Sequence, residues 1–180
     1  MHNSKIKKKI ITLIGPTACN KTSTAVHLIK KFPISIIGVD SVQIYKRFNI
    51  GSAKPPKEIL KKYKHHLVDS ADPENIFSVK DFYDQAYRIV LQAHSNNRIP
   101  LLVGGTMMYF NALFKGINDI PEGNEAIREE LQRELDNRGV DKLFNELKEI
   151  DPESAKTIKQ NDKQRIMRAL EVFKLSGQRI

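Results

Sequence analysis

The residue pattern best suited to chemistry is a short loop near the N-terminus. It matches the phosphate-binding motif G-x-x-x-x-G-K-[ST] at every fixed position but one, because Asn20 stands where the second glycine is usual. Such a loop wraps backbone N–H groups around phosphate oxygens at a helix N-terminus, where the dipole favours negative charge. The Lys21 ammonium adds a point charge, and the Thr22 hydroxyl suits Mg²⁺. The candidate phosphate-binding residues are Gly15, Pro16, Thr17, Ala18, Cys19, Asn20, Lys21 and Thr22.

Asn20 decides how well this loop forms. If the position needs a positive φ angle, asparagine tolerates it better than most residues do. We therefore expect the loop to form, with weakened phosphate binding. The alternative is a chance turn, but an apolar run over residues 10–14 precedes the loop and a helical pattern follows it, which favours a phosphate site.

Two further polar segments follow predicted strands. Asp40 comes directly after the apolar run 34–39 and suits a general base or a metal-binding carboxylate; the alternative is an N-cap for a short helix. A Gly-Gly dipeptide and Thr106 follow the apolar run 99–103 and suit close approach to a phosphate oxygen; a plain strand-to-helix turn explains them equally well. Since parallel strands end at one edge of a sheet, we expect both segments beside the phosphate loop.

A fourth segment covers residues 162–170. Arg165 and Arg168 are three positions apart, so a helix places them on one face, while Ile166 and Leu170 mark the buried face. Paired arginines at a helix start suit phosphate contacts, and the alternative is a solvated basic face.

Strands and helices alternate through the first two thirds of the chain. The three apolar runs are typical of buried parallel strands, and amphipathic segments with helical spacing lie between them. No strand candidate occurs from residue 119 to residue 180. We therefore predict an α/β fold, with a P-loop NTPase-like parallel sheet flanked by helices and an all-helical insertion. The predicted core is residues 1–117, rejoined by residues 161–180, and the insertion is residues 118–160.

Composition is that of a globular protein, with 40% hydrophobic and 28% charged residues in 180. Residues 1–64 hold 14 lysines and arginines against two acids, which suggests a polyanionic partner or, equally well, a solvated lysine surface. The apolar runs are too short to cross a bilayer, and no signal-peptide cleavage pattern follows the basic start. The single cysteine, Cys19, fits a reducing cytoplasm and is interpreted as a small filler in its loop. The adjacent His65 and His66 are interpreted as structural.

Taken together, these segments resemble the tRNA dimethylallyltransferase (tRNA isopentenyltransferase) family. The resemblance covers nearly all of the chain, in the family's order, and its most specific part is the Asp-Ser-x-Gln-x-Tyr block over residues 40–45. It also includes the Gly-Ser-Ala-Lys-Pro block over residues 51–55 and His-His-Leu over residues 65–67. Residues 162–170 resemble the tRNA-acting branch.

The resemblance implies transfer of a dimethylallyl group from dimethylallyl diphosphate to the exocyclic amine of the tRNA adenine 3′-adjacent to the anticodon. The loop over residues 17–22 would hold the diphosphate with Mg²⁺, Asp40 would be the general base, and Thr106 would line the diphosphate channel. Arg128 would contribute a diphosphate or tRNA contact. The residues implied in tRNA binding are Asp40, Ser41, Val42, Gln43, Arg128, Gln164, Arg165, Ile166, Met167 and Arg168.

Family members usually continue well beyond the position of Ile180, so we expect this chain to be a shortened form. Two other readings stay open: a nucleotide or small-molecule kinase that uses the loop for ATP, and an inactive tRNA-binding remnant. We expect a cytoplasmic monomer that binds the tRNA anticodon stem-loop and does not enter a membrane.

Overall fold

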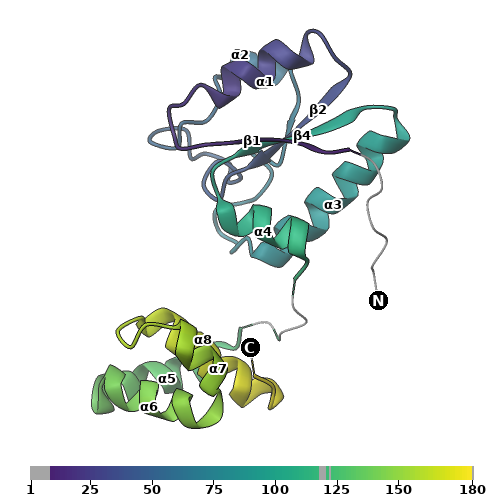
Figure 1. Cartoon of the computed structure of the whole chain (residues 1–180). Helices are drawn as coiled ribbons and strands as arrows, with labels where there is room; N and C mark the ends of the chain where they lie inside the picture. The colour runs from purple at the N-terminus through teal and green to yellow at the C-terminus, as the bar shows by residue number, and fades with distance from the viewer. Residues whose placement is uncertain (1–8, 118–120, 122, 180) are drawn as a thin grey trace. The chain divides into compact units, whose positions relative to one another are not determined.

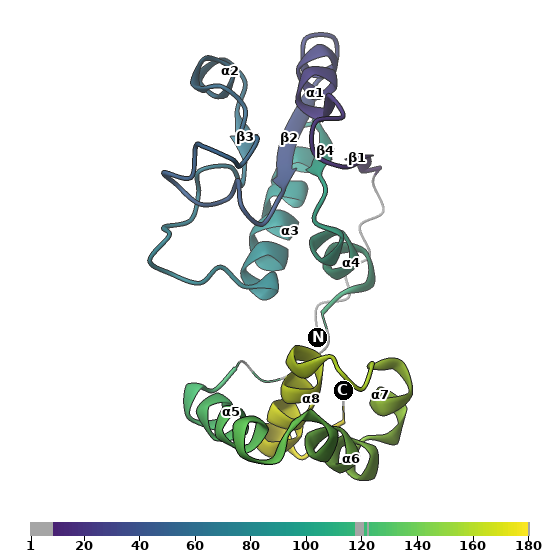
Figure 2. The same cartoon turned by 90° about the vertical axis from the view of Figure 1, so that its left-hand side faces the viewer.

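The computed structural model describes residues 9–117, 121 and 123–179. The chain divides into two compact units, Met1–Ile117 and Asn118–Ile180. The first unit is a sheet with helices, and the second consists of helices (Figures 1 and 2). No helix in the described part of the chain is long and apolar enough to span a membrane.

Four strands form the sheet of the α/β unit, in the order β1-β4-β2-β3, and neighbouring strands run parallel as predicted. The strands are β1 (Ile11–Ile14), β2 (Ile34–Val39), β3 (His65–His66) and β4 (Ile99–Gly104). All six residues of β2 are buried, which agrees with a strand that has neighbours on both sides and helices on both faces.

Helices cover both faces of this sheet (Figure 1). They are α1 (Lys21–Ile29), α2 (Lys57–Lys62), α3 (Val79–Ser95) and α4 (Met107–Lys115). Because successive side chains of a strand point to opposite faces, Ile34 and Ile36 of β2 pack with Ala25 of α1. Ile37 and Val39 of the same strand pack with α3 and α4 instead.

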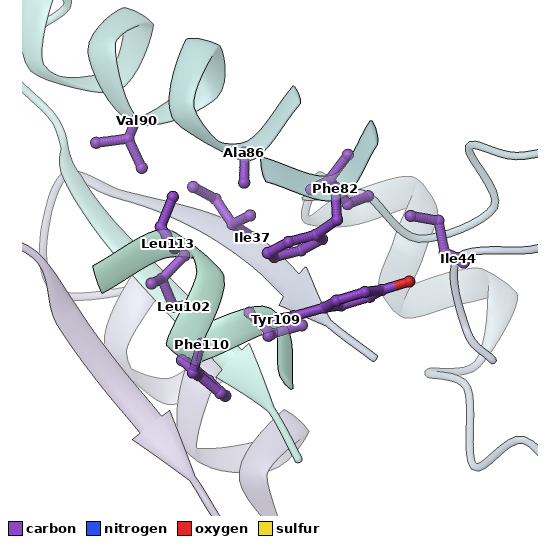
Figure 3. Close-up of a cluster of buried hydrophobic side chains, with 11 residues drawn as sticks. Ile37, Ile44, Phe82, Ala86, Val90, Leu102, Tyr109, Phe110 and Leu113 are labelled. Atoms are coloured by element: carbon purple, nitrogen blue, oxygen red, sulfur yellow. The ribbon is translucent and has the colours of Figure 1, made fainter. Parts of the chain in front are cut away.

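A cluster of buried hydrophobic side chains lies between the sheet, α3 and α4, and it holds both helices on this face of the sheet (Figure 3). The ring of Phe82 on α3 stacks on the ring of Tyr109 on α4, with centroids 4.1 Å apart. Burial is the main cause that raises the pKa of Tyr109 to about 12. Ser78 is the N-cap residue of α3: its Oγ accepts from the Asp81 N–H, while the Asp81 carboxylate accepts from the Ser78 N–H.

One predicted strand differs in its surroundings. The run over residues 10–14 forms β1, but β1 lies at the sheet edge and pairs with β4 alone among the described residues. Ile11 and Ile14 are accordingly 42% and 46% exposed. The prediction of a buried strand is wrong here, because an apolar run shows strand propensity but not whether a neighbour covers each side.

The helical unit contains α5 (Glu125–Arg138), α6 (Val140–Ile150), α7 (Pro152–Thr157) and α8 (Lys163–Ser176). Its core includes Leu131 of α5, Leu147 of α6 and Ile166 of α8, all fully buried. Side chains of Asn124, Asp151 and Asp162 accept backbone N–H groups at the starts of α5, α7 and α8. Residues 163–176 thus belong to the helical unit in this structure, rather than to the α/β unit that residues 161–180 were predicted to rejoin.

Candidate functional site

The loop after β1 adopts the conformation that the motif requires. Asn20 has φ 60° and ψ 21°, the left-handed conformation for which glycine is usual at this position, and it is the N-cap residue of α1. Ala18 also has a positive φ of 67°. A Cβ atom on Gly15 would lie 2.7 Å from the Cys19 Sγ, so the tight wrap needs glycine at its start. The expectation that asparagine supports a formed loop is met.

Lys21 folds back over this loop. Its Nζ donates to the carbonyl oxygen of Gly15 at 2.8 Å and also to that of Pro16, and it lies 3.6 Å from the Cys19 Sγ. The ammonium is therefore positioned by the loop itself, at the start of α1, where the helix dipole adds positive potential.

Asp40 extends from the end of β2 and is half-buried. Its Oδ1 accepts the N–H groups of Val42 and Gln43 at 2.9 and 3.1 Å, so the carboxylate does cap the turn that follows the strand. Its Oδ2 has no hydrogen bond among the described residues. One carboxylate oxygen thus has a structural role, and the other is available to a ligand.

The end of β4 is drawn close to the end of β2. A Cβ on Gly104 would lie 2.0 Å from the Val39 carbonyl oxygen, so only glycine allows this approach. The carbonyl oxygen of Val39 accepts the N–H groups of Gly105 and Thr106, both at 3.2 Å. The Thr106 Oγ1 accepts the Ser41 N–H at 3.0 Å, which ties this hydroxyl to the residue after Asp40.

These segments meet at one cavity of about 540 Å³ in the α/β unit. Residues 17–22 line it from the loop and α1, Asp40 and Gln43 from the segment after β2, and Gly104 from β4. The Asp40 carboxylate and the phosphate loop therefore lie at the same edge of the sheet, where the parallel strands end. Gly15, Pro16, Ser41, Val42 and Thr106 do not line the cavity but lie within or beside the segments that do.

A second group of predicted residues gathers in the helical unit. Arg128 of α5 and Gln164, Met167 and Arg168 of α8 line one groove of about 560 Å³. They come from segments more than 30 residues apart, so packing of α5 on α8 creates the group.

Two predicted tRNA-binding residues are placed differently. Ile166 is fully buried in the helical core, so its side chain packs against other helices, and the tRNA contact expected of this residue stays a prediction. It was predicted both as a buried position and within a binding block, and the packing supports the first. Arg165 is exposed, does not line the groove, and its Nε lies 3.5 Å from the Asp162 carboxylate.

Comparison with known proteins gives the family. The model of the family described as IPP transferase matches residues 43–180. The chain belongs to the IPP transferase family. Among curated members, the tRNA dimethylallyltransferase of Vesicomyosocius okutanii is 47% identical over 98% of this chain and 58% of its own length. That of Dichelobacter nodosus is 45% identical over 94% of this chain and 53% of its own length. The chain thus spans little more than half the length of these relatives.

Solved structures agree with this assignment and with the predicted fold. The full-length tRNA isopentenylpyrophosphate transferase of Bacillus halodurans is 40% identical, with a TM-score of 0.60, over 96% of this chain and 57% of that protein. A eukaryotic dimethylallyltransferase that acts on tRNA is 27% identical, with a TM-score of 0.80, over 96% of this chain and 43% of that one. The P-loop-like parallel α/β fold is therefore confirmed.

The structure of this IPP transferase family member also contains site residues that sequence reasoning gave no role. Lys54, whose side chain is only 3% exposed, donates to the Tyr45 carbonyl oxygen at 2.8 Å and pairs with Asp69 at 2.6 Å. The Gln43 amide donates to the carbonyl oxygens of Ser52 and Ala53, both at 3.1 Å. These contacts hold the segment over residues 51–55 against the cavity, which Ala53 lines. The compact Gly-Ser-Ala-Lys-Pro block was the available signal.

The adjacent histidines form strand β3. The Nδ1 of His65 is 2.7 Å from the Tyr63 carbonyl oxygen, while its buried Nε2 has no hydrogen-bond partner in the part of the chain that the structure describes. Burial lowers the pKa of His65, against the hydrogen bond to Tyr63, which acts to raise it. Among the described residues, no three His, Cys, Asp or Glu side chains gather as a metal site.

Proposed function

We propose that this chain carries the catalytic part of a tRNA dimethylallyltransferase. In the proposed reaction, the bond between the allylic carbon and the diphosphate oxygen breaks, and the exocyclic amine of the adenine 3′-adjacent to the anticodon forms a bond to that carbon. The diphosphate leaves with the bonding electrons, and the amine loses a proton. The observation that carries the proposal is the shared cavity of Asp40 and the phosphate loop.

The loop over residues 17–22 is proposed to hold the diphosphate. Charge builds on the diphosphate oxygens as the allylic bond breaks, and backbone N–H groups with the Lys21 ammonium are prearranged to receive it. Mg²⁺ fits the same place, because the Thr22 hydroxyl lines the cavity and Mg²⁺ prefers oxygen ligands, which include substrate oxygens and water. When bound, the ion would neutralise diphosphate charge.

Asp40 is proposed as the general base. The backbone N–H groups of Val42 and Gln43 fix its Oδ1, so the orientation of the carboxylate is set before substrate binds. Its Oδ2 is the oxygen that can accept the amine proton. Thr106 is proposed to line the diphosphate channel beside Asp40. The hydrogen bond that its Oγ1 accepts from the Ser41 N–H holds its side chain next to this segment.

The tRNA is proposed to bind through two groups of residues, one in each unit. Residues 40–43 supply contacts next to the reacting amine, and Arg128, Gln164, Arg165, Met167 and Arg168 supply contacts from the helical unit. The basic first third of the chain supports a polyanionic partner. A cytoplasmic monomer is proposed as the working form.

The test uses this chain with an anticodon stem-loop RNA that has an adenine at the target position. Wild type is expected to transfer a labelled dimethylallyl group to the RNA, and Asp40→Asn is expected to lose transfer while RNA binding persists. Glu58→Gln, a neutralised carboxylate on α2 that does not line the cavity, serves as control. Full turnover by Asp40→Asn would show that Asp40 is not the base.

Separate binding of labelled ATP and labelled dimethylallyl diphosphate distinguishes the rival functions. Retention of ATP with no retention of the prenyl diphosphate would favour a kinase. Stem-loop binding with neither small molecule retained would favour a tRNA-binding remnant.

A further inference from the structure

Glu171 is a buried acid within the groove of the helical unit. Its side chain is 2% exposed and accepts three hydrogen bonds: from the Asn124 N–H at 2.8 Å, the Arg128 Nε at 2.9 Å and the Arg168 Nη1 at 2.6 Å. Burial by itself would raise its pKa, but the hydrogen bonds from Arg168 and Asn124 and the charges of both arginines lower it below the ordinary value. One carboxylate thus holds two guanidinium groups.

Arg128 uses only part of its hydrogen-bonding capacity there. Among the described residues it donates one hydrogen bond, from Nε to Glu171, and its side chain is 56% exposed. Its Nη2 lies over Gly123, where an added Cβ would come within 1.8 Å of it. Nη2 is thus packed against Gly123, and Nη1, which donates no hydrogen bond among the described residues, is the group available at the groove that Arg128 lines.

Arg168 is held more firmly beside it. Its Nη1 donates to Glu171 and its Nη2 donates to the Pro121 carbonyl oxygen at 2.7 Å. The two arginines share one negative charge, so this cluster of three side chains has a net charge of one positive unit. Guanidinium groups fixed in this way suit the oxygens of a phosphate group, which they bind through paired hydrogen bonds.

The competing explanation is that the Arg128–Glu171 ion pair only joins α5 to α8, since Arg168 and Glu171 are both on α8. The same two helices are already joined by Lys174 and Glu130, an ion pair at 2.8 Å outside the groove lining. Burying a carboxylate is costly, and one cation would neutralise it. Glu171 nevertheless binds two arginines, and Nη1 of Arg128 takes no part in the ion pair, which is more than a connection between two helices needs.

We propose that Glu171 is a positioning residue that orients Arg128 and Arg168 as a two-arginine clamp for a phosphate group. This inference rests on the proposed function for the source of that phosphate, which is the tRNA backbone or the diphosphate of the prenyl donor. Gln164 and Met167 line the same groove and would contact the group that carries the phosphate.

The experiment measures the affinity of the whole chain for anticodon stem-loop RNA and, separately, for inorganic diphosphate. The proteins are wild type, Glu171→Gln, Arg128→Lys and the double variant. Glu130→Gln is the matched control, because it removes an acid that joins α5 to α8 outside the groove lining. Thermal melting shows which variants are folded.

Glu171→Gln and Arg128→Lys are each expected to weaken RNA binding about tenfold, since each loses an oriented guanidinium fork. Lysine keeps the charge at position 128, so this loss would report geometry rather than charge. The double variant is expected to bind no more weakly than the weaker single variant, and Glu130→Gln is expected to bind like wild type. If Glu171 had a purely structural role, its substitution would change the melting temperature, but the effects of the two substitutions on RNA affinity would not depend on each other.

The outcomes separate the two proposals. If wild type binds RNA and all variants bind it equally well, the clamp is overturned and the proposed function stands. If wild type binds neither ligand, the proposed function fails and the clamp with it. If only diphosphate affinity falls, the clamp belongs to the diphosphate. If Glu171→Gln does not fold, unchanged RNA and diphosphate affinity of Arg128→Lys suffices to overturn the clamp.

Discussion

The ammonium of Lys21 lies 2.8 Å from the carbonyl oxygen of Gly15, so the lysine closes the phosphate loop on itself. Phosphate oxygens entering the cavity would take over these hydrogen bonds, as they carry full negative charge and carbonyl oxygens do not. The position of the ammonium is therefore prepared for the ligand before it binds.

Lys21→Met is expected to weaken diphosphate binding roughly tenfold to a hundredfold, the equivalent of about 1.5–3 kcal/mol for a hydrogen bond to a charged group. Isothermal titration calorimetry with inorganic diphosphate checks it. Lys31→Met is the control, because Lys31 is exposed and does not line the cavity. Equal losses in both variants would point to general charge rather than to the loop.

Asn20 already has the left-handed backbone that the loop needs. Asn20→Gly is therefore expected to change diphosphate affinity by less than about twofold, since glycine adopts the same conformation without strain. Asn20→Ala is expected to lower the free energy of unfolding by about 1 kcal/mol, because alanine lacks the local hydrogen bonding that lets asparagine adopt this region. Urea unfolding and calorimetry give the two quantities. A large gain in affinity for Asn20→Gly would mean that the loop is distorted.

Local signals in the sequence were sufficient for most of the fold. The apolar run over residues 34–39 forms a strand as predicted, and the Gly-Gly pair lies at the end of the predicted strand β4. The exposure of β1 could not be predicted, because a strand's neighbours are set by pairing far along the chain. The same limit applies to the packing of α8. Its sequence shows an apolar face but does not show which part of the protein that face packs against.

The site shows the same division. The phosphate loop and Asp40 carry local signals, and the topology of a parallel sheet brings them to one cavity. Glu171 carries no such signal, because an acid on an amphipathic helix usually faces water. It becomes buried only when α5 places Arg128 and the Asn124 N–H against it. The block of adjacent residues 164–168 includes the buried Ile166, because any run of five residues on a helix includes its buried face.

Lys54 is expected to stabilise the segment that borders the cavity. Lys54→Met keeps the aliphatic volume but leaves the Tyr45 carbonyl oxygen without its donor, so the free energy of unfolding should fall by about 1–3 kcal/mol. Diphosphate affinity should fall as well, because Ala53 next to it lines the cavity. Urea unfolding checks the first effect, and Lys57→Met on the exposed side of α2 is the control. Unchanged stability would show that water supplies the lost donor to both the Tyr45 carbonyl oxygen and the Asp69 carboxylate.

Stability should also depend on pH through His65. Its pKa is lowered, chiefly by burial, so the folded state binds a proton less readily than the unfolded state. If its Nδ1–H donates to the Tyr63 carbonyl oxygen, protonation would charge a ring whose Nε2 is buried without a partner. The stabilising contribution is therefore complete above the unfolded pKa of about 6.5 and is lost as pH falls toward the folded value, by at most about 1.4 kcal/mol per pH unit.

Urea unfolding between about pH 5 and about pH 7.5 measures this effect as the slope of the free energy of unfolding against pH. His65→Leu is expected to reduce the slope, and the remaining slope belongs in part to His66, whose pKa is lowered by burial and then by the charges of Lys64 and Arg98. His27→Leu is the control, since His27 is exposed on α1 and its removal should leave the slope as it is. If His65→Leu keeps the full slope of wild type, another group must become protonated on unfolding, and the buried ring of His65 is not the cause.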